Sequence, residues 1–269
     1  MKKLLFITFL LLSISSFSQN NLINTQTENL IGNVKSYEKK TIVKMKNSDE
    51  FTLKYHVKYV FDKDGNIASI ESYGSDNTLD SKEVFFYTDG NLKEITQYNS
   101  VGKAGKITLF DYDEKNRINS KRKFNTQGKL QEETSYLYNS KNQLATQQKL
   151  IPSINYLMKE NYTYDAKGNR VKSEKKARIG TTIEVFQYNA EHLVIKKMEY
   201  NAMGELFSEI DYKYNKQKDK IGLSKKDQSG EISYFENYHY KYDSKGNWIE
   251  KISFERDLKV SVETREIAY

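Results

Sequence analysis

The chain has 269 residues, of which 21 are Tyr, 13 Phe and 1 Trp, with 1 proline and no cysteine. The absence of cysteine excludes disulfide frameworks, thiolate metal sites, iron–sulfur clusters and cysteine nucleophiles. Its 43 basic and 36 acidic residues are interspersed and give a net charge of +7, which indicates a solvated surface rather than a nucleic-acid footprint. We therefore expect no nucleic-acid partner.

The first 18 residues have the pattern of a secretory signal peptide. Lys2 and Lys3 precede an apolar run over residues 4–14, and small residues occupy the positions that determine cleavage, ending at Ser18. The run of 11 residues is too short to span a bilayer, which takes about 20. We expect cleavage near Ser18, export to the periplasm or the outside, and no membrane span in the rest of the chain.

Residues 19–50 are predicted to form an N-terminal cap segment and the first strand. From residue 51 the chain alternates with a period of two: Leu53, Tyr55 and Val57 are separated by Lys54 and His56. This period is typical of a β-strand with one apolar and one mainly polar face.

Aromatic residues recur in two columns between residues 51 and 255. Anchor aromatics, each followed by a turn, are spaced by 24 to 28 residues, and a second aromatic lies two residues before each anchor. A fixed period of this length is typical of a repeated supersecondary unit. The anchors are Phe61, Tyr87, Tyr112, Tyr138, Tyr164, Tyr188, Tyr214 and Tyr242. The preceding column is Tyr59, Phe85, Phe110, Tyr136, Tyr162, Phe186, Tyr212 and Tyr240.

Turn residues follow each anchor, and a second set lies half a period later. Asp or Asn follows seven of the eight anchors, and a residue that tolerates a left-handed backbone comes shortly after it. Each unit therefore holds two strands, and eight units predict an all-β antiparallel meander of about sixteen strands, as an elongated, curled sheet or a solenoid-like array. Residues 256–269 are expected to add a closing strand. The predicted structural turn glycines are Gly65, Gly90, Gly128, Gly168, Gly204, Gly230 and Gly246.

The units YTYDAKGNR (Tyr162 to Arg170) and YKYDSKGNW (Tyr240 to Trp248) resemble the YD repeat of RHS-type bacterial proteins. The resemblance covers residues 51–255 and is nearest to small secreted proteins with degenerate YD repeats. It implies β-hairpin repeats and a location at the cell surface or outside the cell. It also implies carbohydrate binding, an opening such as LIGNVKSYEKK that caps the array, and a GNWI element near the end.

Residues with catalytic or metal-binding potential are few. His56, His192 and His239 lie in separate units, so we expect no metal site. Residues 62–66 look like the start of a calcium loop, but Tyr73 stands where such a loop needs glutamate, so turn chemistry explains them better. No catalytic motif occurs. We therefore expect no cofactor and no enzymatic activity.

The aromatic columns are the repeated feature with binding potential, because aromatic faces stack on sugar rings and tyrosine hydroxyls add hydrogen bonds. The alternative is that these side chains cover the packed face of the sheet and that Trp248 packs at its end. The candidate binding residues are Tyr59, Phe85, Phe110, Tyr136, Tyr138, Tyr162, Tyr164, Tyr188, Tyr212, Tyr214, Tyr240, Tyr242 and Trp248.

The sequence thus predicts an exported, non-enzymatic binding or scaffolding module at the cell envelope or outside the cell. Its partner would be a glycan or another envelope or secreted protein. Two alternatives remain open: a component of an RHS-type toxin or immunity system, and a small envelope enzyme with an unrecognised site. An outer-membrane barrel is disfavoured, because lysines and glutamates interrupt both faces of many strands where a lipid-facing band must be apolar.

Overall fold

The computed structural model describes residues 28–46 and 48–269, so the predicted signal peptide lies outside the described residues. This part of the chain forms 18 β-strands and one 3-10 helix, η1 (Pro152–Ile154). The strands are β1 (Ser36–Lys44), β2 (Phe51–Phe61), β3 (Ile67–Tyr73), β4 (Leu79–Thr88), β5 (Asn91–Asn99), β6 (Ala104–Tyr112), β7 (Ile118–Phe124), β8 (Leu130–Tyr138), β9 (Leu144–Ile151), β10 (Tyr156–Tyr164), β11 (Arg170–Ala177), β12 (Gly180–Tyr188), β13 (Val194–Asn201), β14 (Leu206–Tyr214), β15 (Lys220–Lys226), β16 (Ile232–Tyr242), β17 (Trp248–Glu255) and β18 (Leu258–Ala268).

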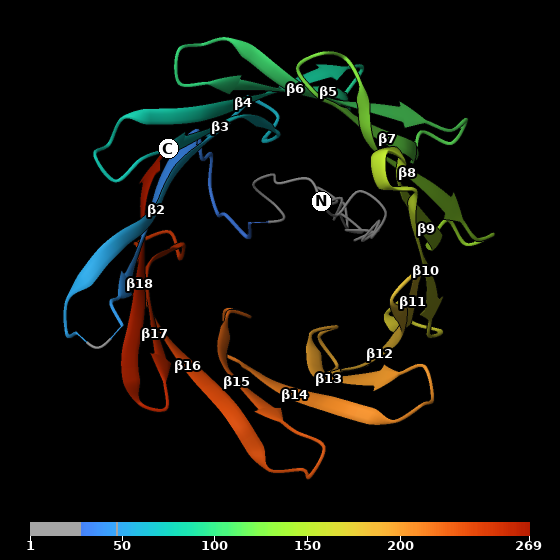
Figure 1. Cartoon of the computed structure of the whole chain (residues 1–269). Coiled ribbons are helices and arrows are strands. Elements are labelled where there is room, and N and C mark those ends of the chain that lie inside the picture. The colour runs from blue at the N-terminus through green and yellow to red at the C-terminus, as the bar shows by residue number, and fades with distance from the viewer. Residues whose placement is uncertain (1–27, 47) are drawn as a thin grey trace, which may run out of the picture.

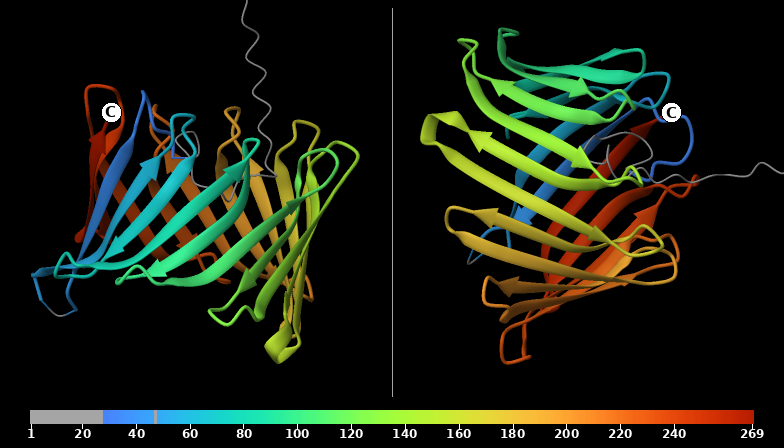
Figure 2. Two further views of the ribbon diagram at one scale, coloured as in Figure 1. Left: turned by 90° about the horizontal axis from the view of Figure 1, so that it is seen from above. Right: turned by 90° about the vertical axis from the view of Figure 1, so that its right-hand side faces the viewer.

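The strands close into a barrel. Each strand pairs antiparallel with the next one along the chain, from β1–β2 to β17–β18. The last strand then pairs with the first, with Ser36 opposite Ala268 and Val43 opposite Ser261. Figure 1 looks down the axis of this ring, and Figure 2 shows it from two further sides. Every described strand therefore has a partner on both sides.

The predicted open sheet or solenoid of about sixteen strands is wrong. The sheet has 18 strands and is closed, because the strands near the two ends of the chain pair with each other. An open meander would leave the backbone N–H and C=O groups of both end strands unpaired. Strand twist and the stagger between neighbours curl the sheet until these edges meet. The hairpins are thus parts of one closed sheet and not the units of an open repeat array.

Successive connections alternate between the two ends of the barrel. The eight that follow even-numbered strands, from β2–β3 to β16–β17, lie at the end where β18 finishes, and we call this end the anchor rim. The nine that follow odd-numbered strands, from β1–β2 to β17–β18, lie at the opposite end, which we call the far rim (Figure 2, left).

Seven of the eight anchor-rim turns are held by the side chain of their first residue, an Asp or Asn. The Asp62 carboxylate accepts hydrogen bonds from the backbone N–H groups of Asp64 and Asn66, at 2.8 and 2.9 Å, and Gly65 has a left-handed φ of 79°. A side chain that accepts from the backbone two and four residues on stabilises such a turn. All the predicted turn glycines have a φ between 73° and 91°: Gly65, Gly90, Gly128, Gly168, Gly204, Gly230 and Gly246.

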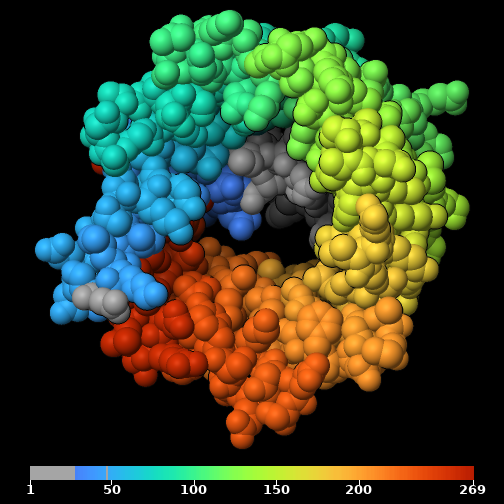
Figure 3. All heavy atoms as spheres, in the orientation of Figure 1, coloured from blue at the N-terminus to red at the C-terminus, as the bar shows by residue number. Residues whose placement is uncertain are grey.

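Two small apolar clusters lie beside the anchor rim, and buried residues are otherwise scattered. One contains Val34, Tyr37, Phe61 and Ile67, and the other contains Leu92, Phe110 and Ile118. Among residues 28–46 and 48–269 the buried side chains form no further hydrophobic cluster, and Figure 3 shows the ring of strands open in its middle. In the two described ranges, no helix is long and apolar enough to cross a bilayer.

Candidate binding site on the inner wall of the barrel

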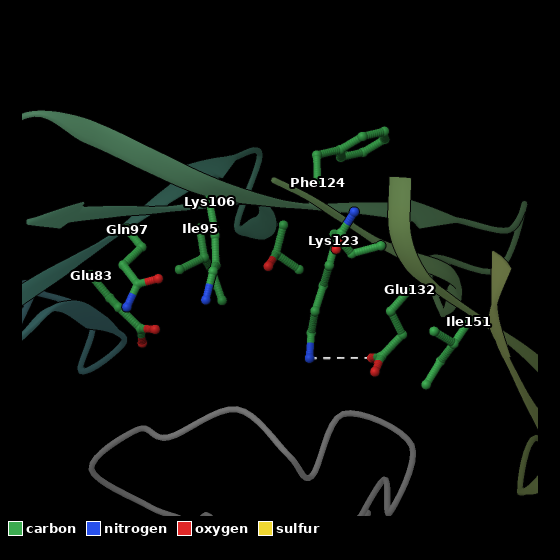
Figure 4. A pocket seen from close by; sticks show the side chains of 10 residues that line it. Glu83, Ile95, Gln97, Lys106, Lys123, Phe124, Glu132 and Ile151 are labelled. Carbon is green, nitrogen blue, oxygen red and sulfur yellow. Dashed lines mark ion pairs between the residues drawn. The ribbon is translucent and has the colours of Figure 1, made fainter. Parts of the chain in front are cut away.

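A cavity of about 380 Å³ lies on the inner wall, between side chains contributed by strands β4 to β9. Figure 4 shows Glu83, Gln97, Lys106, Lys123 and Glu132 pointing from their strands into the ring. The register agrees, since Glu83 lies opposite Gln97 and Lys123 lies opposite Glu132. Side chains alternate across a strand, so every second residue of these strands lines the lumen.

Basic side chains outnumber acidic ones on this part of the wall. Lys123 and Lys149 both pair with Glu132, with Nζ to carboxylate distances of 3.2 and 3.1 Å. Burial raises the pKa of Glu132, but hydrogen bonds from the two ammonium groups outweigh burial and hold it below its usual value. Lys106 has no ion-pair partner among the described residues. Burial, reinforced by repulsion from Lys123, lowers the pKa of Lys121. Two carboxylates, Glu83 and Glu132, thus face four ammonium groups on this part of the wall, and the surplus of positive charge favours an anion.

The anchor tyrosines use their hydroxyls to tie each hairpin to the one before it. Tyr138 donates to the carbonyl oxygen of Ile118, 20 residues earlier, at 2.7 Å. The same bond recurs around the barrel, from Tyr87 to Ile67, Tyr112 to Leu92, Tyr164 to Leu144, Tyr188 to Arg170 and Tyr214 to Val194. In the last unit Tyr240, of the preceding column, makes this bond to Lys220, while the anchor Tyr242 donates to the carboxylate of Asp219 at 2.7 Å. These hydroxyls therefore have a structural role, which sequence reasoning did not foresee.

We expect Tyr138→Phe to lower the free energy of unfolding by about 1 kcal/mol, because it leaves the carbonyl oxygen of Ile118 without its donor. Chemical denaturation of parent and variant measures this. The matched control is Tyr55→Phe, at a ring that is 54% exposed, where the change should stay within about 0.5 kcal/mol. Equal losses at both positions would contradict the structural role.

Several rings of the preceding column already have a cation over one face. The guanidinium carbon of Arg170 lies 5.2 Å from the ring centre of Tyr162 and 5.3 Å from that of Phe186, and Lys220 Nζ lies 4.7 Å from that of Tyr212. Such contacts stabilise packed rings. The sugar-stacking role of the two columns stays a prediction.

Trp248 lies where the two ends of the chain meet. The guanidinium carbon of Arg265 is 3.7 Å from its ring centre, and the edge of the indole meets Tyr240 at 6.1 Å. Nearby, Asn247 bonds the backbone N–H and C=O of Ile31 at 2.6 and 2.8 Å. The LIGN opening and the GNWI element, which the sequence placed at opposite ends of an array, therefore pack against each other.

The three histidines each contact a different partner. His56 stacks on Tyr73 with ring centres 4.6 Å apart, His192 bonds Asn169 at 2.7 Å, and His239 packs beside Phe254. In the part of the chain that the structure describes, no group of three or more metal-binding side chains occurs.

Sequence reasoning missed the lysine cluster. The signal was present in β7, where Lys121 and Lys123 are two residues apart and so share one face, with Arg122 on the other. The full cluster could not be predicted from β7 alone, because Lys149 comes from β9. The pairing register of β8 with β9 places Lys149 beside Glu132.

These observations define a closed, hollow β-barrel with a polar inner wall. No family model and no curated protein sequence matches the chain. Its fold is similar to that of a porin-like protein from Bacteroides uniformis, with a TM-score of 0.50 and 10% identity over 88% of this chain and 99% of that chain. A porin-like protein from Bacteroides vulgatus matches with a TM-score of 0.40 and 11% identity over the same shares. A complex of TcdB2, TccC3 and Cdc42 matches with a TM-score of 0.35 and 13% identity, over 84% of this chain and 15% of that chain.

The predicted membership of the YD-repeat or RHS-repeat family is wrong. The chain matches no family model, and its fold is that of a porin-like closed barrel. The physical reason lies in the motif itself. An aromatic, then Asp or Asn, then a residue with positive φ is what any tight hairpin with an inward aromatic requires. The motif is therefore explained by hairpin chemistry.

Proposed function

We propose that the chain is an exported, non-enzymatic binding module that acts at the cell envelope or outside the cell and holds an acidic glycan on the inner wall of its barrel. The observation that carries this proposal is the cavity of about 380 Å³, which is lined by Lys106 and Lys123 and lies on a wall where four lysines face two glutamates. Small-molecule sites have volumes of about 300 to 1,000 Å³, so the cavity suits a short stretch of a sugar chain.

The lining of the cavity matches the chemistry of a charged sugar. Gln97, Thr108 and Gln131 offer hydrogen-bonding groups for hydroxyls, while Ile95 and Ile151 offer apolar contact for the C–H faces of the rings. Lys106 and the other lysines of the wall supply the positive charge that carboxylates on a sugar would neutralise.

The outer wall supports an aqueous location for the barrel. Lys82 is the neighbour of the inward-facing Glu83 in β4, so its side chain lies on the outer wall. There its Nζ pairs with the carboxylate of Glu71 at 2.9 Å. Arg122, between two inward lysines, pairs with Asp111 at 2.8 Å. Charged pairs on the outward face suit water, because a lipid-facing wall needs a continuous apolar band.

The proposal predicts that Lys106→Gln with Lys123→Gln weakens binding of an acidic polysaccharide at least about tenfold, because the two cations that line the cavity are lost. Calorimetry of the exported chain, with the expected signal peptide removed, measures this with polygalacturonate as the acidic probe and dextran as the neutral one. Binding should also weaken as salt rises.

The matched control is Lys159→Gln with Lys213→Gln, two exposed lysines on the outward face, which should bind like the parent. Equal affinity of the parent for both polysaccharides would overturn the acidic preference. No binding of either would overturn the proposed ligand class.

A further inference from the structure

The connections of the far rim carry single apolar side chains that project into solvent. Ile179 is 94% exposed, Val101 83% and Met203 79%. Of the nine far-rim connections, seven have an exposed large apolar residue in the turn or at the first residue after it. The most exposed such residue of each connection, which we call its tip, is Met45, Val101, Ile154, Ile179, Met203, Ile232 or Leu258.

The anchor rim shows the opposite pattern. None of its eight described turns contains an exposed large apolar residue, and their sequences are polar, as in 62–66, 113–117 and 139–143. Exposed apolar residues scattered singly over a surface need no explanation. Their concentration at one end of the barrel and absence from the turns at the other does need one, because both ends are built from similar hairpins.

We propose that the far rim docks on the surface of a lipid bilayer, with the tips inserted among the lipids and the barrel standing in water. The tips lie one to a turn around a ring, rather than in one continuous patch. A rigid protein partner would need a matching pocket for each tip, whereas lipid chains fill the space around any apolar projection. Stable protein interfaces instead rely on a contiguous, well-packed area.

The charge of the far rim selects the kind of bilayer. Its turns carry five basic residues, Lys46, Lys103, Lys129, Arg178 and Arg256, against seven acidic ones, Asp49, Glu50, Asp76, Glu205, Asp227, Glu231 and Asp257. A rim this close to neutral gains nothing from anionic headgroups, which attract surplus lysine and arginine. The expected surface is therefore zwitterionic, and binding comes from the buried apolar area.

The proposal is independent of the glycan site, which lies on the inner wall. Docking by the far rim would leave the anchor-rim mouth of the barrel facing the water. Loss of lipid binding by a rim variant with unchanged polysaccharide binding would separate the two.

Flotation of the exported chain with phosphatidylcholine vesicles tests the docking. The variant joins Val101→Ser, Ile154→Ser, Ile179→Ser and Met203→Ser, and its partition coefficient should fall at least about tenfold. The substituted side chains are exposed, so the circular dichroism spectrum and the melting temperature should match those of the parent.

The matched control is Phe86→Ser with Leu137→Ser, which removes exposed apolar residues from the outward wall and should bind vesicles like the parent. No flotation of the parent, or equal flotation of the rim variant, would overturn the proposal. Binding only to phosphatidylglycerol vesicles would overturn its zwitterionic part. A dimer seen by light scattering and abolished in the rim variant, without vesicle binding, would assign the rim to a second copy of the chain instead.

Discussion

Arg265→Met should lower the free energy of unfolding by about 2 kcal/mol, because it removes the buried member of a partly buried ion pair at the place where the barrel closes. Arg265 is 8% exposed and pairs with Glu28 at 2.6 Å. Its guanidinium carbon also lies between two rings, 4.8 Å from the centre of Tyr37 and 3.7 Å from that of Trp248. The side chain thus joins the segment before β1 to β17 and β18.

The pairing of β1 with β18, which we call the seam, contributes more to stability than other strand pairs because it joins distant parts of the sequence. The other described pairs join strands that follow each other in sequence, whereas β1 and β18 are separated by most of the chain. When the pairing within a hairpin is weakened, the turn still keeps its two strands close together. When β1 and β18 separate, no turn joins them and two strand edges are exposed at once. Pairing β1 with β18 also has the largest entropic cost of loop closure in the barrel, because most of the chain lies between these two strands.

Denaturant unfolding of three further variants tests this reasoning. Arg265→Lys should be intermediate, because it keeps the charge and loses the planar group that stacks on the rings. Arg178→Met, in an exposed turn, should change stability by less than about 0.5 kcal/mol. Adding Glu28→Gln to Arg265→Met should cost less than the sum of the single changes. A loss below about 1 kcal/mol for Arg265→Met would show that this pair does not hold the seam.

The local parts of the fold could be predicted from the sequence, because they depend on neighbours along the chain. The turn at 62–66 needs an acceptor at Asp62 and a left-handed residue at Gly65, and both are legible in the sequence. Strand alternation is equally local. The 3-10 helix at Pro152–Ile154 shows the limit, because nothing in the repeat predicts it and it ends where Asn155 adopts a left-handed φ of 46°.

Closure and the inner site could not be predicted, because they depend on residues far apart in sequence. Nothing in β1 or in β18 alone shows that Lys39 lies opposite Arg265. The aromatic columns drew attention because they repeat, yet repetition is also what a structural bond such as Tyr138 to Ile118 demands. The cavity on the inner wall does not repeat around the barrel, since its lining comes from strands β4 to β9, so the sequence period does not reveal it.

Alkaline pH should unfold the barrel in a single steep transition between about pH 10 and 12, because its tyrosines stay protonated only while they are packed. Burial raises the pKa of Tyr138 to about 12, and burial with the nearby Glu132 charge raises that of Tyr136 to about 12. Burial also raises the pKa of Tyr87 and Tyr162. Many such groups act together around the ring.

Stability falls at alkaline pH because proton binding and folding are linked. An unfolded tyrosine has a pKa of about 10, so the folded state holds these protons more tightly. The stabilisation is complete below about pH 10 and is lost as the pH rises through the folded values near 12. Lysine pairs act in the same direction, since the hydrogen bond with Glu209 raises the pKa of Lys196.

Tyrosinate absorbance and circular dichroism, followed in one titration, measure this transition. The absorbance of the packed tyrosines should rise only as the β-sheet signal falls. Tyr136→Phe keeps the ring and removes one shifted hydroxyl, so its transition should move to higher pH. Tyrosines that all ionise near pH 10 while the sheet remains intact would show that the columns are solvated. In that case their faces would be free for the sugar stacking that the sequence suggested, and the ligand site would have to be sought there.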